Sequence, residues 1–141
     1  MEIEVSIVVD RPIATVWDFY AVRHVQNHPR SDPDLELEKL SDGPIGLGTV
    51  IRRRNVRYDE PTEGSMEVTE FETERVMGVR IQDGPIETRG RATFSFVSPD
   101  ATGMTIWAEF PGMDESMADK IRPLMKRSSE TIKQLIESET D

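Results

Sequence analysis

The strongest constraint on the fold is a change in the spacing of apolar residues near residue 115. Before this point, short segments alternate apolar and polar residues, which is the two-residue period of strands with one buried face. Beyond it, the apolar residues recur at helical spacing: Met117, Ile121, Leu124, Met125, Ile132, Leu135 and Ile136. Pro123 lies within this stretch and should bend or locally break the helix, because proline lacks the amide donor. A run of strands followed by one long amphipathic helix is typical of an α+β fold, with the helix packed on one face of a sheet.

The first 40 residues predict one strand and a short helix. Residues 3–9 alternate as a strand does, and Pro12 is typical of a first helical turn. The apolar residues of the segment 13–20 then have helical spacing. For residues 24–33 we expect a loop or one broken helical turn, because Pro29 directly follows His28 and disfavours a helix there.

Turn-forming residues divide the middle of the chain into strands. Alternating Leu35 and Leu37 predict one of them. Further strands are predicted over residues 49–58, 65–71, 76–82, 86–97 and 104–110. Short strands joined by regular turns are typical of an antiparallel meander, here of about seven strands in all.

Length and composition exclude several classes of protein. The 141 residues correspond to one domain, which we place over residues 1–141. Cysteine is absent, which excludes disulfides, thiolate nucleophiles and cysteine-ligated metals. Because 27 acidic residues against 17 basic ones give a net charge of −10, we expect no nucleic-acid partner. The N-terminal residues lack the basic start and apolar run of a signal peptide, and no apolar run is long enough to span a membrane. We therefore expect a soluble cytoplasmic protein with no integral membrane association.

Several local strings carry a resemblance that extends over essentially the whole chain. Pro12, Val16 and Trp17 form a Pro-x-x-x-Val-Trp opening of the first helix, and a glycine-rich turn at 42–49 ends in Gly-Thr. With the segments 68–72 and 84–94, these strings resemble the polyketide cyclase/dehydrase family of the START-like (SRPBCC, Bet v 1-like) superfamily. Members of this family often have Trp-x-Pro after the second short helix, whereas residues 27–33 hold no tryptophan.

The resemblance implies the helix-grip fold, in which a curved antiparallel sheet wraps around the long C-terminal helix and two short helices follow the first strand. It also implies a cavity between sheet and helix that binds a hydrophobic or amphipathic small molecule, such as a lipid, a polyketide-like compound or an aromatic one. One alternative is a polyketide cyclase/aromatase or a dehydratase, and another is a protein-interaction module of the same fold. We expect no cofactor and no metal, and either a monomer or a weak homodimer.

Candidate ligand-binding residues follow from strand alternation, from the adaptability of methionine to irregular apolar shapes, and from the resemblance. For each of them, ordinary core packing is the alternative interpretation. The candidates are Tyr20, His24, Ile51, Arg53, Phe94, Ile106, Phe110, Met113, Met117, Ile121 and Met125.

The strand predicted at 49–58 carries a run of arginines, and either of its faces could point into the cavity. The resemblance favours the face with Ile51, Arg53 and Asn55 over the face with Arg52 and Arg54. A buried Arg53 would need a partner or an anionic ligand. Residues 59–74 hold seven acids and no Lys or Arg, so ordinary cross-strand ion pairs with this segment are the alternative expectation for the arginine run.

No catalytic residue can be assigned from the sequence. His24 and His28 are four residues apart, but a metal would need a third ligand. The sequence contains neither the grouping of a nucleophilic triad nor a dinucleotide fingerprint. In the cyclase interpretation, Tyr20, His24 or Arg53 would polarise a carbonyl. Trp107 is out of phase with its apolar neighbours, which places it on the outer face of the sheet or at an interface.

Overall fold

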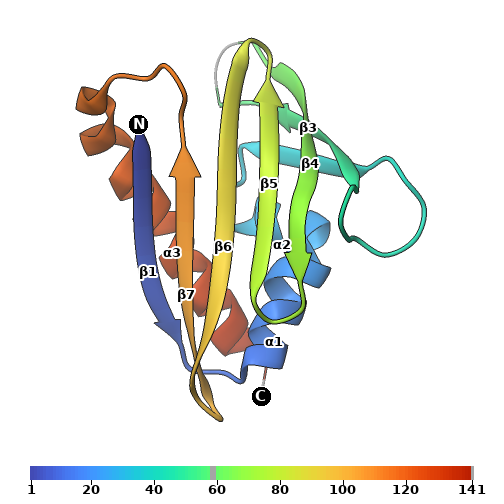
Figure 1. Ribbon diagram of the computed structural model, residues 1–141, viewed down its shortest axis with the longest axis vertical. Helices are drawn as coiled ribbons and strands as arrows, with labels where there is room; N and C mark the ends of the chain where they lie inside the picture. The colour runs from blue at the N-terminus through green and yellow to red at the C-terminus, as the bar shows by residue number, and fades with distance from the viewer. Residues whose placement is uncertain (58–59, 141) are drawn as a thin grey trace.

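The computed structural model describes residues 1–57 and 60–140, and it places seven strands in one antiparallel sheet (Figure 1). Their order across the sheet is β1-β7-β6-β5-β4-β3-β2, so each strand from β2 to β7 pairs with its neighbour in the sequence. The first strand instead pairs with the last, from Glu2 opposite Glu109 to Val9 opposite Thr102. The strands are β1 (Glu2–Val9), β2 (Leu35–Lys39), β3 (Val50–Asn55), β4 (Thr62–Glu72), β5 (Val76–Asp83), β6 (Ile86–Ser98) and β7 (Ala101–Glu109).

The helices lie together on one face of this sheet, here called the inner face (Figure 1). Helix α1 (Ile13–Trp17) continues into a π-helical turn, η1 (Asp18–Val22), and α2 (His24–Ser31) follows. After β7, a single 3₁₀ turn, η2 (Glu115–Met117), leads into the long helix α3 (Ala118–Glu139). This arrangement confirms the predicted helix-grip fold, with two short helices after the first strand and one long helix at the C-terminal end.

The strand boundaries differ from the prediction at three places. Strands β4 and β7 each begin three residues early, at Thr62 and Ala101, because pairing with the preceding strand continues into residues that have turn chemistry. Strand β3 ends at Asn55, earlier than predicted. The last residue of that predicted strand, Tyr58, lies outside the described residues.

The prediction of a loop or one broken helical turn over residues 24–33 is wrong, because α2 is an eight-residue helix from His24 to Ser31. Pro29 removes only one helical hydrogen bond, and tertiary contacts hold the helix despite that loss. The Asn27 side-chain amide donates to the carbonyl oxygen of Phe19 at 2.9 Å. The Ser31 hydroxyl donates to the carbonyl oxygen of His28 at 2.9 Å.

Of the bend or local break predicted at Pro123, the break is wrong, since α3 runs without interruption from Ala118 to Glu139. The missing amide would have bonded the carbonyl oxygen of Asp119, which lies in an exposed first turn. Water can therefore replace the lost donor, so the helix needs no break.

The core lies between the inner face of the sheet and the helices. The Trp17 ring contacts the rings of Phe71 and Phe94, with centroids 5.1 and 5.2 Å apart. Of the apolar residues that alternate along one face of β6, Ala92 and Phe94 are buried, whereas two others are exposed. Ile86 is 53% exposed and Phe96 is 66% exposed, because they lie at the two ends of the strand, next to the hairpin turns.

Candidate functional site

Helix α3 buries its apolar stripe unevenly. Ile121, Met125, Ile132 and Ile136 lie on one side of the helix, because they are separated by close to whole numbers of turns. Ile132 and Ile136 are fully buried in the core, whereas Ile121 and Met125 are only half-buried. The N-terminal half of the stripe is therefore accessible to solvent, although it continues the face that packs on the sheet.

Hydrogen bonds to β1 show which part of the sheet each half of α3 crosses. Arg122 donates to the carbonyl oxygen of Glu4 at 3.3 Å, and the Lys133 ammonium donates to that of Val8 at 2.7 Å. Glu4 pairs with Trp107 and Val8 pairs with Gly103. The accessible N-terminal half of α3 therefore lies by the C-terminal end of β7.

The inner face of the sheet has the same gradient of burial. Met104 and Ala92 are buried, whereas Ile106 and Ala108, farther along β7, are half-buried. Strand β5 repeats this pattern, since Met77 is buried and the inward Val79 and Ile81 are half-buried. We call the half-buried apolar side chains of these inner strands and of the N-terminal half of α3 the open apolar surface: Val79, Ile81, Ile106, Ala108, Ile121 and Met125.

A polar cluster lies where η1 and α2 pack on the core. The rings of His24 and His28 stack with centroids 4.6 Å apart, and the Tyr20 ring meets that of His24 edge-on at 5.2 Å. The Tyr20 ring also contacts Phe94 at 5.7 Å, which joins the cluster to the core. Because the carbonyl oxygen of Tyr20 can only accept, the His24 Nδ1 that lies 2.9 Å from it is the protonated nitrogen.

Burial perturbs all three of these titratable groups. It raises the pKa of Tyr20 to about 12. It lowers the pKa of His24 to about 3, with a further contribution from the charge of His28. It lowers the pKa of His28 to about 4, and the nearby Arg53 charge acts in the same direction. Both imidazoles are therefore neutral at pH 7, and the cluster offers hydrogen bonds without a net charge.

His28 Nδ1 is a buried polar atom that, within the described residues, has no hydrogen-bond partner. The His28 side chain is also part of the lining of a small, partly open pocket of about 10 Å³, with Phe19, Tyr20, Asn27 and Ile132. A buried polar atom without a partner costs about 1–3 kcal/mol, so this nitrogen is a point where a polar ligand atom or a water molecule would be stabilised.

The structure points Arg53 toward the inner face and gives it a protein partner. Ile51, on the same side of β3, is fully buried, which agrees with the face that the resemblance favoured. Arg53 Nε lies 2.9 Å from Asp83 Oδ1, and the two side chains are 12% and 17% exposed. This pair spans Gly64 on the strand between them, where a Cβ would lie 1.8 Å from the Gln82 carbonyl oxygen. The positive charge is thus compensated within the protein, and Arg53 does not require an anionic ligand.

The other arginines of the run form ion pairs with carboxylates on the protein surface, which is the alternative expected from the sequence for this run. Arg52 pairs with Glu63 at 3.2 Å, and Arg54 pairs with Glu36 at 3.0 Å. Arg57 contacts Asp32 and Asp34 at 3.4 and 3.3 Å. The partners are Glu63 on β4, Glu36 on β2, and Asp32 and Asp34 in the connection between α2 and β2, so only one of them belongs to the acidic segment that follows β3.

The structure brings together one part of the predicted candidate set. Ile51 and Phe94 belong to the buried core, His24 is buried beside it, and Tyr20 and Ile106 pack against it. A second part is half-buried outside this core, in the β7–α3 connection and the first half of α3: Phe110, Met113, Met117, Ile121 and Met125.

Sequence reasoning missed several residues of the site. The sequence suggests His28 only as a possible metal ligand, and Asp83 lies between the predicted strands 76–82 and 86–97. Val79, Ile81 and Ala108 were not selected, although alternation along β5 and β7 places them on the inner face. That alternation was the signal that could have identified all three.

Solved structures of several proteins are similar to this chain over its whole length. The crystal structure of Ara h 8.0201 matches with a TM-score of 0.77 at 12% identity, over 98% of both chains. Norcoclaurine synthase from Thalictrum flavum, in complex with dopamine and hydroxybenzaldehyde, matches with a TM-score of 0.72 at 16% identity, over 100% of this chain and 88% of that one. The di-domain ARO/CYC BexL from the BE-7585A biosynthetic pathway matches with a TM-score of 0.75 at 19% identity. The match covers 97% of this chain but only 46% of the BexL chain.

Comparisons of the sequence itself give no further assignment. No family model matches it, and no curated protein matches it. Among the described helices, none is long and apolar enough to cross a membrane. Identities of 12–19% support conclusions about the fold alone. The sheet, the long helix and these structural matches together show that the chain has the Bet v 1-like helix-grip fold.

Proposed function

We propose that this protein binds a hydrophobic or amphipathic small molecule between the sheet and the N-terminal half of α3. The observation that carries this proposal is the open apolar surface, whose side chains face the inside of the fold and yet remain half-exposed. Burial of apolar surface contributes about 25 cal/mol of stabilising free energy per Å², and apolar surface that stays in contact with water does not make this contribution. A ligand that covers this surface would recover that free energy.

The polar cluster supports an amphipathic ligand over a purely aliphatic one. Small-molecule sites are mostly apolar and have a few polar groups that fix the orientation of the ligand. Tyr20 and His28 are polar groups of this kind, and the neutral imidazole of His28 suits a hydroxyl or a carbonyl group. Norcoclaurine synthase, which shares the fold, is known in complex with the aromatic compounds dopamine and hydroxybenzaldehyde. A similar aromatic or polyketide-like compound is the ligand class that we propose here.

Two alternatives have less support. The cyclase or dehydratase interpretation, suggested by the likeness to an ARO/CYC protein, needs an effective acid or base. Burial lowers the pKa of His24 to about 3, which makes this imidazole a weak base at neutral pH. The interaction-module interpretation predicted an exposed apolar patch around Trp107. That side chain is instead half-buried and hydrogen-bonded to Glu2 at 2.9 Å.

Binding can be tested with N-phenyl-1-naphthylamine, an uncharged dye whose fluorescence rises in an apolar site. We expect saturable binding to the native protein. Ile106→Trp should weaken this binding at least about tenfold, or about 1.4 kcal/mol, because the larger side chain fills part of the open apolar surface. The dye should also raise the melting temperature, since it binds only the folded chain.

Val97→Trp is the matched control, because it introduces the same side chain at an exposed position near the β6–β7 turn. It should leave the affinity for the dye unchanged. Equal binding by both variants, with both folded by circular dichroism, would contradict the proposed location. Failure of the native protein to bind the dye would contradict the proposal as a whole.

A further inference from the structure

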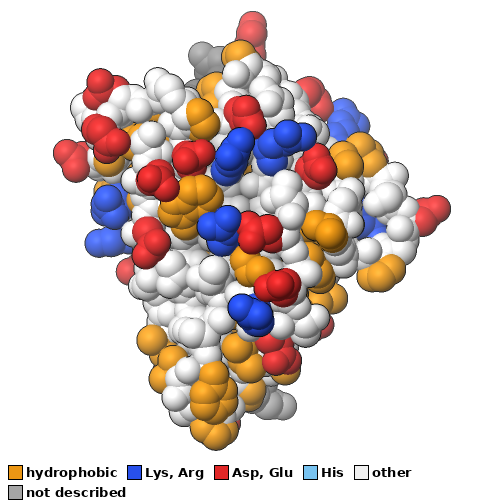
Figure 2. Space-filling model, in the orientation of Figure 1, with side chains coloured by type: hydrophobic (Ala, Val, Ile, Leu, Met, Phe, Trp, Pro, Cys, Tyr) orange, Lys and Arg blue, Asp and Glu red, His pale blue; other side chains and the backbone are white. Residues whose placement is uncertain are grey.

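The outer face of the sheet carries a second pocket, which the proposed function does not use. Figure 2 shows this face, where basic and acidic side chains alternate over the central strands. The pocket has a volume of about 320 Å³, within the range of about 300–1,000 Å³ that is common for small-molecule sites. Its lining comes from four neighbouring strands, β4 to β7: Thr69, Glu70, Val79, Arg80, Arg89, Gly90, Arg91 and Trp107.

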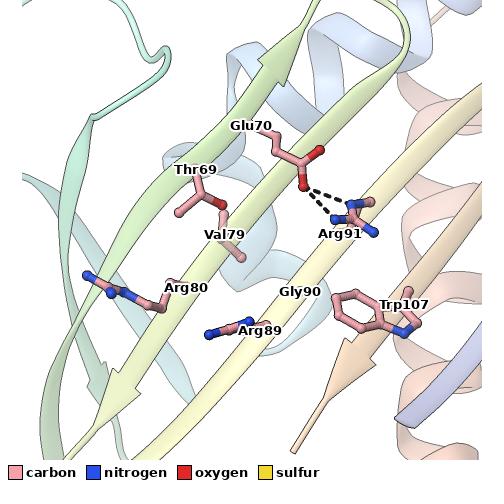
Figure 3. A pocket seen from close by; sticks show the side chains of 8 residues that line it. All are labelled: Thr69, Glu70, Val79, Arg80, Arg89, Gly90, Arg91 and Trp107. Carbon is pink, nitrogen blue, oxygen red and sulfur yellow. Dashed lines mark hydrogen bonds and ion pairs between the residues drawn. The ribbon is translucent and has the colours of Figure 1, made fainter.

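The pocket is open to solvent, and its two sides carry different side chains (Figure 3). On one side, Arg91 forms an ion pair with Glu70, with Nη2 and Oε1 2.7 Å apart. The Arg91 guanidinium carbon also lies 5.1 Å from the centroid of the Trp107 ring. On the other side lie Arg80 and Arg89, which are directly opposite each other in the β5–β6 register. The pocket therefore combines an aromatic ring with two adjacent like charges.

Arg89 differs from the other arginines of the sheet. Arg80 pairs with Glu67 at 3.0 Å, and every arginine of β3 also has a carboxylate partner. Among the arginines of the described strands, Arg89 alone has neither an ion pair nor a side-chain hydrogen bond. The chain has 27 acidic residues for 17 basic ones, so carboxylates are abundant. An arginine without one, next to a second arginine, is a local exception to the pairing pattern.

Like charges directly opposite each other destabilise an antiparallel sheet. Glu67 already compensates Arg80, whereas Arg89 has no counterion among the described residues, and a carboxylate matches the planar donor geometry of its guanidinium. We propose that this pocket binds a small organic carboxylate, whose charged end pairs with Arg89 and whose apolar part contacts Trp107. Arg89, Arg91 and Trp107 lie on the opposite face of the sheet from the open apolar surface, and Val79 is the one residue named in both sites.

The two tryptophans make the test specific, because Trp107 lines the pocket and Trp17 is buried in the core. Their indole N–H signals can be followed in ¹⁵N-labelled protein during titration with 1-naphthoate, and a Trp107→Phe variant assigns the two signals. We expect a saturable shift of the Trp107 signal while the Trp17 signal stays in place. The uncharged analogue 1-naphthamide should give no saturable shift.

Substitutions separate specific binding from a general charge effect. Arg89→Gln should weaken 1-naphthoate binding at least about tenfold, because it removes the guanidinium that has no partner among residues 1–57 and 60–140. Arg75→Gln is the matched control, since it removes the same charge at an exposed position near the β4–β5 turn, outside the pocket lining. It should leave the affinity within about twofold of the native value.

Three outcomes would overturn the proposal. Equal shifts with 1-naphthamide would show that the ring binds without any role for the carboxylate. Equal losses in Arg75→Gln and Arg89→Gln would show a long-range charge effect. A shift of the Trp17 signal alone would place the ligand on the inner face. Because the uncharged dye tests the inner face separately, a negative result here leaves the proposed function unaffected.

Discussion

At the scale of single residues, the buried histidines couple stability to pH. In the unfolded chain each imidazole has a pKa near 6.5, whereas burial lowers these pKa values to about 3 for His24 and about 4 for His28. Below pH 6.5 the unfolded chain therefore binds protons that the folded chain does not. The contribution to stability is complete above pH 6.5 and is lost as the pH falls toward 4.

We therefore expect the free energy of unfolding to fall by about 2 kcal/mol for each histidine between pH 7 and pH 5. Urea denaturation at a series of pH values measures this loss. His24→Asn should flatten the pH dependence in that interval, even if the variant is less stable at pH 7. The lowered pKa values of Glu137 and Glu139 act in a more acidic range, below about 4.5. An unchanged slope in the variant would show that His24 is protonated in the folded protein.

At the scale of elements, the last turn of α3 is held by the segment that follows β1. Arg11 donates hydrogen bonds to the carbonyl oxygen of Glu137, to the carbonyl oxygen of Thr140 and to the Thr140 hydroxyl. The backbone amide of Asp10 donates to Glu137 Oε2 at 2.8 Å. A cation at a helix C-terminus satisfies carbonyl groups that have no partner in the helix and interacts favourably with the helix dipole.

Arg11→Leu should therefore lower the free energy of unfolding by about 1–3 kcal/mol, since it removes charged hydrogen bonds from half-buried carbonyl groups. Thermal or urea denaturation gives this value. Arg127→Leu serves as the control, because Arg127 is exposed on the same helix, and it should change stability by less than about 0.5 kcal/mol. Similar losses in the two variants would mean that the helix end does not depend on Arg11.

At the scale of the whole molecule, assembly of the sheet depends on pairing between its first and last strands, which are farthest apart in the sequence. Strand β1 pairs with β7, about a hundred residues later, and α3 then packs against β1. Non-local pairing of this kind slows folding, because the entropy of loop closure is lost before the contacts form. We expect refolding in milliseconds to seconds, followed by stopped-flow fluorescence of the buried Trp17. Refolding in microseconds would show that local hairpins, and not the closure by β1, limit the rate.

Much of the fold was predictable from the sequence, because strand and helix periods are local properties. The seven strands and the long helix follow from the spacing of residues such as Val5, Leu37 and Ile132. The helix α2 did not follow, because Pro29 opposes it locally and contacts such as that between Asn27 and Phe19 stabilise it. The first residues of β4 and β7 were not predicted for a similar reason, since the neighbouring strand determines how far the pairing extends.

The candidate site was predictable only in part. Alternation correctly placed Phe94 and Ile51 on the inner face, but it gave no measure of how deeply a residue on that face is buried. The open apolar surface depends on which rows of the sheet α3 covers, and that depends on contacts such as those of Arg122 and Lys133 with β1. The pairing of Arg53 with Asp83 likewise depends on strand register.

The sequence by itself determined the elements, the faces they bury and the one-domain α+β architecture, because periodicity along the chain determines which side of each element is apolar. Only the tertiary structure decided which charges are paired, which apolar residues remain accessible and how Arg80 comes to face Arg89. Those properties depend on register between strands and on the position of α3, and both bring together residues that are far apart in the sequence.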